Sequence, residues 1–103
     1  MEVLYDTVLG IDVHQALLAC CIVKCVNGQM VTEKRTFETY GKDLHEMAQW
    51  AKDSNVDLVI MESTGIYWRT PYQVLEKVGI KAAVVNARQV KQMEGKKTDM
   101  GDG

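Results

Sequence analysis

Several features that mark special classes of protein are absent from this sequence of 103 residues. It has one proline, eight glycines and 25% charged residues, which excludes collagen-like, coiled-coil and disordered chains. Its longest apolar run, at 16–23, is far below the roughly 18 residues that a transmembrane helix requires. The first residues, Met1-Glu2-Val3, lack the basic region of a signal peptide. We therefore expect one soluble, cytoplasmic domain with a single hydrophobic core.

The cysteines do not form a disulfide framework, because they are odd in number and crowded together. Cys20, Cys21 and Cys25 lie in one short apolar stretch. Neighbours on a β-strand point to opposite faces, so Cys20 and Cys21 are poorly placed to share a metal ion. We predict free thiols that pack as small apolar side chains in a reducing compartment.

Hydrophobic periodicity predicts three strands, followed by helices that alternate with strands. Strands are expected at 7–13 and 17–26, and Asn27-Gly28 predicts a type I′ turn into a polar edge strand at 29–37. The later pattern predicts a helix at 42–53, a second helix that ends near residue 78, and a third helix at 87–94. Strands are expected at 57–61 and 80–85, and a flexible tail at 95–103.

Individual residues refine these elements. The first helix has an apolar stripe of Leu44, Met47, Ala48 and Ala51. Pro71 must lie in the first turn of the second helix, which begins either at Pro71, capped by Thr70, or a few residues earlier. Gly79 suits the position just after that helix. The strand at 57–61 is continuously apolar, which predicts burial on both faces.

The order of these elements predicts the topology of the sheet. Right-handed crossovers place the fourth strand parallel to the first, and the fifth strand beside the fourth. The result is a five-stranded mixed sheet of order 3-2-1-4-5 with flanking helices, an α/β fold of the ribonuclease H-like type. A flavodoxin-like sheet would need a helix between its first strands, for which Asn27-Gly28 leaves no room.

This topology brings four carboxylates towards one rim. Asp12 lies near the end of the first strand and Glu62 ends the fourth, and parallel neighbours end at the same edge of a sheet. Asp99 and Asp102 share a face if their segment is helical. Closely spaced carboxylates need a cation, and two Mg²⁺ or Mn²⁺ ions suit phosphoryl displacement. We predict that all four residues bind metal and are catalytic.

The distribution of charge suits a phosphodiester substrate. The net charge of −2 conceals a basic segment, because residues 81–97 carry +4 and the other residues −6. Arg88, Lys91, Lys96 and Lys97 are the candidate nucleic-acid contacts. A merely solvated basic face is the alternative.

Each candidate ligand also has a structural interpretation. Asp12 alone could form a turn, Glu62 could favour the start of the next helix, and Asp99 and Asp102 could simply be solvated. His14 is either a ligand or general base beside Asp12, or a surface residue.

Several other residues have a structural interpretation as well as a functional one. Ser63 and Thr64 are expected to cap a helix, and His45 is expected on the surface. Three aromatic residues are expected either to stack on bases or to pack against the sheet: Tyr67, Trp68 and Tyr72.

Three motifs occur in order along the chain. They are Gly10-Ile11-Asp12-Val13-His14, Met61-Glu62-Ser63-Thr64-Gly65, and Val85-Asn86 leading to Lys97-Thr98-Asp99 and Asp102. With these motifs the chain resembles the DEDD transposases, insertion-sequence recombinases related to the Piv-type DNA invertases. The likeness covers almost the whole chain.

The resemblance implies a RuvC-like domain in which Asp12, Glu62, Asp99 and Asp102 bind divalent metal, normally Mg²⁺, for DNA cleavage and strand transfer. It also implies homo-oligomers, a structured guide RNA in many members, and a C-terminal domain with a serine that attacks DNA. Because the chain stops at Gly103, we expect residues 1–103 to be the N-terminal catalytic domain of a longer transposase. Alone, this domain is expected to be inactive in strand exchange.

Three other classes of protein are alternatives to a transposase. Sugar-kinase and actin-type phosphotransferases need Asp-x-Gly-x-Thr/Ser after the first strand, and proofreading exonucleases need Asp-x-Glu. The segment Asp12-Val13-His14-Gln15-Ala16 fits neither pattern. A non-catalytic ribonuclease H-like module for oligomerisation or for RNA or DNA binding stays open.

Overall fold

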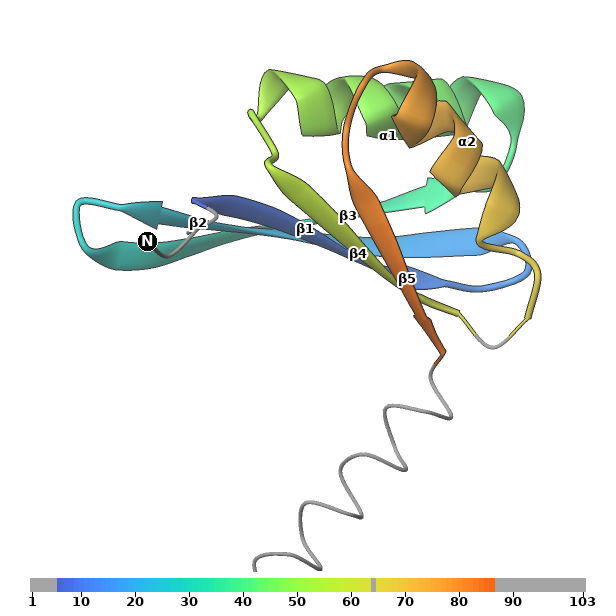
Figure 1. Ribbon diagram of the computed structural model, residues 1–103, viewed down its shortest axis with the longest axis horizontal. Helices are drawn as coiled ribbons and strands as arrows, with labels where there is room; N and C mark the ends of the chain where they lie inside the picture. The colour runs from blue at the N-terminus through green and yellow to red at the C-terminus, as the bar shows by residue number, and fades with distance from the viewer. Residues whose placement is uncertain (1–5, 64, 87–103) are drawn as a thin grey trace, which may run out of the picture.

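Three antiparallel strands open the fold. The computed structural model of the protein describes residues 6–63 and 65–86. In it, β1 (Thr7–Val13), β2 (Leu17–Val26) and β3 (Gln29–Glu38) pair in sequence. Asn27 and Gly28 have positive φ angles of 51° and 79°, as a type I′ turn requires. The predicted hairpin is therefore confirmed, and its turn projects beyond the rest of the sheet (Figure 1).

Two helical crossovers add the parallel half of the sheet. α1 (Gly41–Asp53) leads to β4 (Leu58–Ser63), and α2 (Arg69–Lys77) leads to β5 (Ala82–Asn86). β4 is parallel to β1, and β5 is parallel to β4. The order β3-β2-β1-β4-β5 confirms the predicted topology. The predicted helix at 87–94 and the tail at 95–103 lie outside the described residues.

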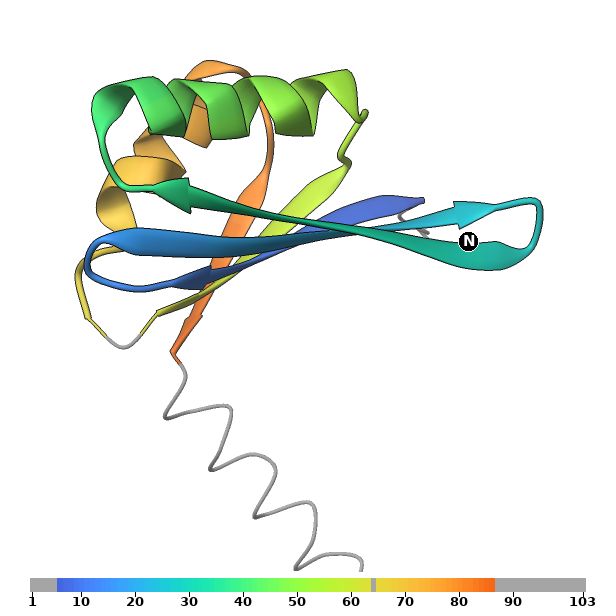
Figure 2. The ribbon, with the colours of Figure 1, turned by 180° about the vertical axis from the view of Figure 1, so that it is seen from behind.

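Both described helices cover the same face of the sheet, as the two opposite views show (Figures 1 and 2). Alternate residues of β1, namely Leu9, Ile11 and Val13, point to that face and are at most 4% exposed. They pack with the predicted stripe of α1, which is buried throughout. The hydrophobic core therefore lies between the helices and one side of the sheet.

The opposite face of the sheet is uncovered in the described part of the chain. Val59 and Met61 of β4 are fully buried beneath the helices, but Ile60 between them is 40% exposed. Within residues 6–63 and 65–86, β4 is therefore buried on one face only, and the prediction of burial on both faces is wrong for this part of the chain. Its apolar sequence is explained on one side by the core and on the other by an apolar open face.

The ends of α2 follow from local backbone chemistry. The helix begins at Arg69, so Pro71 lies in its first turn and the earlier of the two predicted starts is correct. At its other end, Gly79 has a φ of 81° and donates its N–H to the Glu76 carbonyl at 3.0 Å. The Ile80 N–H reaches the Leu75 carbonyl at 3.1 Å. Because this capping motif uses Ile80, β5 begins at Ala82 and not at residue 80 as predicted.

A side-chain clamp joins the starts of β1 and β4. The Oδ2 atom of Asp57 accepts the backbone N–H groups of Asp6 and Thr7 at 3.0 and 3.1 Å. The Asp57 N–H in turn donates to the Thr7 carbonyl at 2.8 Å. These three hydrogen bonds hold the two strands in one register, and the register determines which residues meet at their far ends.

None of the helices that the structure describes is long and apolar enough to cross a membrane.

The clamp makes a stability prediction. Asp57→Ala is expected to lower the free energy of unfolding by about 1–2 kcal/mol, because two backbone N–H groups lose a charged acceptor. Asp57→Asn keeps one acceptor oxygen and should lose less. Urea unfolding followed by circular dichroism measures both. Equal stability of wild type and Asp57→Ala would show that the clamp does not hold the strands together.

Candidate functional site

Asp12 and Glu62 lie side by side on neighbouring parallel strands. They are partners in the β1–β4 register, each one residue before the end of its strand. The even-numbered residues of both strands point away from the helices, so both side chains are on the uncovered face. Neighbouring strands are about 4.8 Å apart, so the two residues are direct neighbours on that face. The prediction that these two residues meet at one edge of the sheet is therefore confirmed.

His14 extends the same rim just beyond β1. Its Nε2 atom lies 3.2 Å from Oδ2 of Asp12, and the two side chains are 55% and 58% exposed. Both groups are thus accessible to an ion or a substrate from solvent. The structure makes His14 a direct neighbour of the candidate ligand, which the sequence left open.

Asp12 and Glu62 line a depression of about 320 Å³ on the open face of the sheet. Besides the two acids, its lining is almost wholly small or apolar: Gly10, Ile11, Ala19, Cys21, Ile60 and Val85. Asp12 and Glu62 are therefore the charged groups of an otherwise apolar depression on the open face. Sequence reasoning did not place Cys21 here, although its pairing with Gly10 across β1 and β2 puts it on this face.

The two adjacent cysteines occupy opposite sides of β2, as predicted. Cys20 is 4% exposed in the core, and burial raises the pKa of its thiol to about 12. Cys21 is half-buried in the depression and Cys25 is exposed. All three are free thiols.

Ser63 does not cap α2, contrary to the prediction, because it ends β4 and the helix begins only at Arg69. Thr64 lies outside the described residues. Ser63 points into the core, where it is 3% exposed, and so lies on the opposite face from Glu62. Its Oγ donates to the Gly65 carbonyl at 3.3 Å. This bond shapes the turn that leaves β4 next to the acid pair.

The aromatic residues divide between packing and exposure. Trp68 and Tyr72 make an edge-to-face contact with ring centroids 5.6 Å apart and pack against the core. Tyr67 is 44% exposed, and His45 is an exposed residue of α1 as predicted. The packing interpretation therefore holds for Trp68 and Tyr72.

The remaining predicted site residues lie outside the part of the chain that the structure describes. These are Asp99 and Asp102 among the acids, and Arg88, Lys91, Lys96 and Lys97 among the bases. Within residues 6–63 and 65–86, no cluster of three or more His, Cys, Asp or Glu side chains forms a ready metal site. Asp12, Glu62 and His14 therefore do not by themselves make such a cluster in the described part of the chain.

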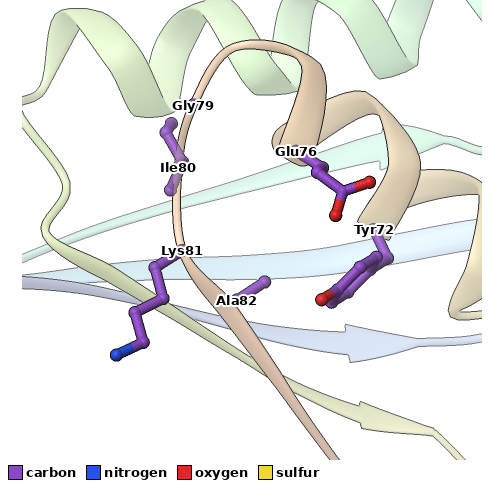
Figure 3. Close-up of a pocket in the computed structure, with 6 residues that line it drawn as sticks. All are labelled: Tyr72, Glu76, Gly79, Ile80, Lys81 and Ala82. Atoms are coloured by element: carbon purple, nitrogen blue, oxygen red, sulfur yellow. The ribbon is translucent and has the colours of Figure 1, made fainter.

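A second hollow, of about 420 Å³, lies between α2 and the start of β5 (Figure 3). Tyr72 and Glu76 enter it from the helix, while Lys81 points away from the Glu76 carboxylate. It opens on the helix side of the sheet, at the end of β5 remote from the acid pair. Its residues do not extend the carboxylate site.

The strand order and the helix placement define a ribonuclease H-like domain. The model of a transposase family, the DEDD transposases of the IS110 type, matches residues 9–103. The chain belongs to this family of transposases.

Solved structures with similar folds include the Holliday junction resolvase of fowlpox virus. It superposes with a TM-score of 0.56 at 15% identity, covering 78% of this chain and 60% of the resolvase. The same resolvase in complex with Holliday junction DNA gives 0.54 at 18% identity, with the same coverage. A Ppx/GppA family member from Aquifex aeolicus gives 0.49 at 16% identity, covering 82% and 36%.

The chain thus spans between about a third and three-fifths of the length of these solved proteins. At such low identity, the likeness to the resolvase establishes the fold. No match is found among curated protein sequences.

The placement of the cysteines predicts an order of alkylation. At pH 8, iodoacetamide should modify Cys25 first and Cys21 more slowly, with Cys20 at least about 100-fold slower than Cys25, because the thiolate is the reactive form. Tandem mass spectrometry resolves the adjacent sites, and all three should react equally in urea. Native modification of Cys20 as fast as Cys21 would contradict the assignment of their faces.

Proposed function

We propose that this chain is the metal-binding domain of a DNA transposase, in which Asp12 and Glu62 hold divalent cations against a DNA phosphodiester. The observation that carries the proposal is the direct pairing of these acids in the β1–β4 register. Membership of a transposase family supports DNA strand cleavage and transfer as the reaction. The fowlpox virus resolvase with a similar fold was solved with Holliday junction DNA, which supports DNA as the substrate class.

The donor set fits Mg²⁺ or Mn²⁺. Both ions prefer carboxylate oxygens and retain waters that a phosphate can displace. Asp12 is 58% exposed, so a cation bound there stays open to a substrate. The face that carries both acids is free of the two described helices, which leaves access for a nucleic-acid backbone.

The remaining acids and bases are proposed to join from the segment after β5. Asn86 ends β5 and pairs with Ser63, the neighbour of Glu62, so the chain leaves the sheet at the rim of the acid pair. Asp99 and Asp102 follow within reach of this rim, since each extended residue spans about 3.3 Å. The basic residues of the same segment are proposed to contact the DNA backbone: Arg88, Lys91, Lys96 and Lys97.

In this arrangement Asp12 and Glu62 would hold divalent cations on the open face. Bound divalent ions would neutralise charge on the phosphate and activate the attacking oxygen. We propose that residues 1–103 form the RuvC-like N-terminal domain of a longer, oligomeric transposase that completes strand exchange.

Metal binding predicts a gain in thermal stability. Mg²⁺ or Mn²⁺ at ten times its Kd should stabilise the native state by about 1.4 kcal/mol, or roughly 5–10 °C in Tm. Asp12→Asn and Glu62→Gln should each abolish most of this gain. Differential scanning fluorimetry with and without EDTA measures it.

The matched control is Glu46→Gln, an exposed acid on α1 over the opposite face. It should leave the gain unchanged. A concentration of 10 mM is about tenfold above a millimolar Kd. If neither ion raises the Tm of the wild-type protein at this concentration, the result would favour the non-catalytic module instead.

Contacts between the basic segment and DNA predict steep salt dependence. If Lys91, Lys96 and Lys97 each neutralise one phosphate, replacing all three by Ala should reduce the slope of log Kd against log salt by about 3. Fluorescence anisotropy with a labelled duplex measures the slope. The matched control replaces three exposed lysines of the helical face, Lys42, Lys52 and Lys77. Equal slopes for the two triple variants would refute the assignment.

A further inference from the structure

We propose that His14 supplies a nitrogen ligand to the cation held by Asp12, so that the site prefers a first-row transition ion over Mg²⁺. The proposal rests on the metal-binding function above and adds a donor and a class of ion to it. Its starting observation is the pair formed by Nε2 of His14 and Oδ2 of Asp12, 3.2 Å apart on the open rim.

The separation of these two atoms suits two ligands of one ion. Neighbouring ligands of an octahedral cation, with bonds of about 2.1 Å, are about 3.0 Å apart. The 3.2 Å between Nε2 and Oδ2 differs from that value by only about 0.2 Å. A cation about 2.1 Å from each atom, to one side of the line that joins them, would therefore leave their separation almost unchanged.

The backbone holds His14 in this position. Its N–H donates to the Leu17 carbonyl at 2.9 Å and closes the short connection between β1 and β2. Thr39 braces the same connection from the end of β3, since its N–H bonds the Ala16 carbonyl at 3.3 Å and its Oγ1 the Gln15 carbonyl at 3.2 Å. The backbone that carries the imidazole is therefore held in place, and only the side-chain torsions of His14 have to be ordered when an ion binds.

A stabilising role in the fold is a weak explanation for the contact. Both side chains are more than half exposed, and exposed ion pairs contribute about 0–1 kcal/mol or nothing measurable. A ligand role uses the Nε2 lone pair and places the ring proton on Nδ1. Imidazole nitrogen is a poor partner for Mg²⁺, whereas Mn²⁺ accepts an imidazole beside its carboxylate ligands and later first-row ions bind it more strongly, which sets the preference.

The chain itself makes the test unambiguous, because His14 and His45 are its two histidines. Mn²⁺ added to the 103-residue protein should show ¹⁴N coupling to imidazole in pulsed electron paramagnetic resonance. His14→Ala should remove this coupling and weaken Mn²⁺ binding at least about 10-fold. Its Kd for Mg²⁺, measured by calorimetry, should change less than about 3-fold, since Mg²⁺ relies on the carboxylates.

His45→Ala is the matched control, because His45 is exposed on α1 over the other face of the sheet. It should keep both the coupling and the affinity. Mn²⁺ that binds with no imidazole coupling, or with coupling that survives in His14→Ala, would overturn the role of His14 while leaving the carboxylate site intact. A protein that binds neither ion would overturn the proposed function together with this inference.

Discussion

The parallel register between β1 and β4 is the constraint on which the candidate site depends. Asp57 ties the starts of the two strands through three hydrogen bonds, and the ladder then carries that alignment to the pair of Asp12 and Glu62. Side chains alternate along a strand, so a slip of one residue would turn one acid into the core. Hydrogen bonds at one end of the sheet thus determine which groups meet at the other end.

The alternation of side chains along β1 and β4 places the residues that stabilise the fold and the candidate site residues on opposite faces of the sheet. Ile11 and Met61 point to the helices and are almost completely buried, while Asp12 and Glu62, their neighbours in sequence, point to the open face. Burial of one side stabilises the strands, and the acids on the other side stay accessible to solvent and avoid the cost of desolvating a charge. Substitution of the acids therefore changes the site without removing the contacts that fold the domain.

Local signals made most of the fold predictable. The Asn27-Gly28 turn and the helix-ending Gly79 are chemical requirements of the backbone, and the crossover rule converted the element order into the sheet order. The Asp57 clamp, the exposure of Ile60 and the place of Cys21 depend on contacts between distant segments, which no local pattern contains. The adjacency of the first two acids followed from topology. The roles of the last two acids stay proposals, because the described residues end at β5.

The acid pair differs from an ordinary pair of surface carboxylates in the charged groups around it. On edge strand β3, Glu33 is compensated by Arg35 at 3.3 Å and by the Trp50 Nε1–H at 3.3 Å. Like charges on facing positions of adjacent strands are unfavourable, and Asp12 and Glu62 occupy such positions. Among the residues the structure describes, neither acid has a lysine or arginine within salt-bridge distance, and His14 is the basic group beside them. A carboxylate pair that has no lysine or arginine partner and is open to solvent favours a divalent cation as its counter-charge.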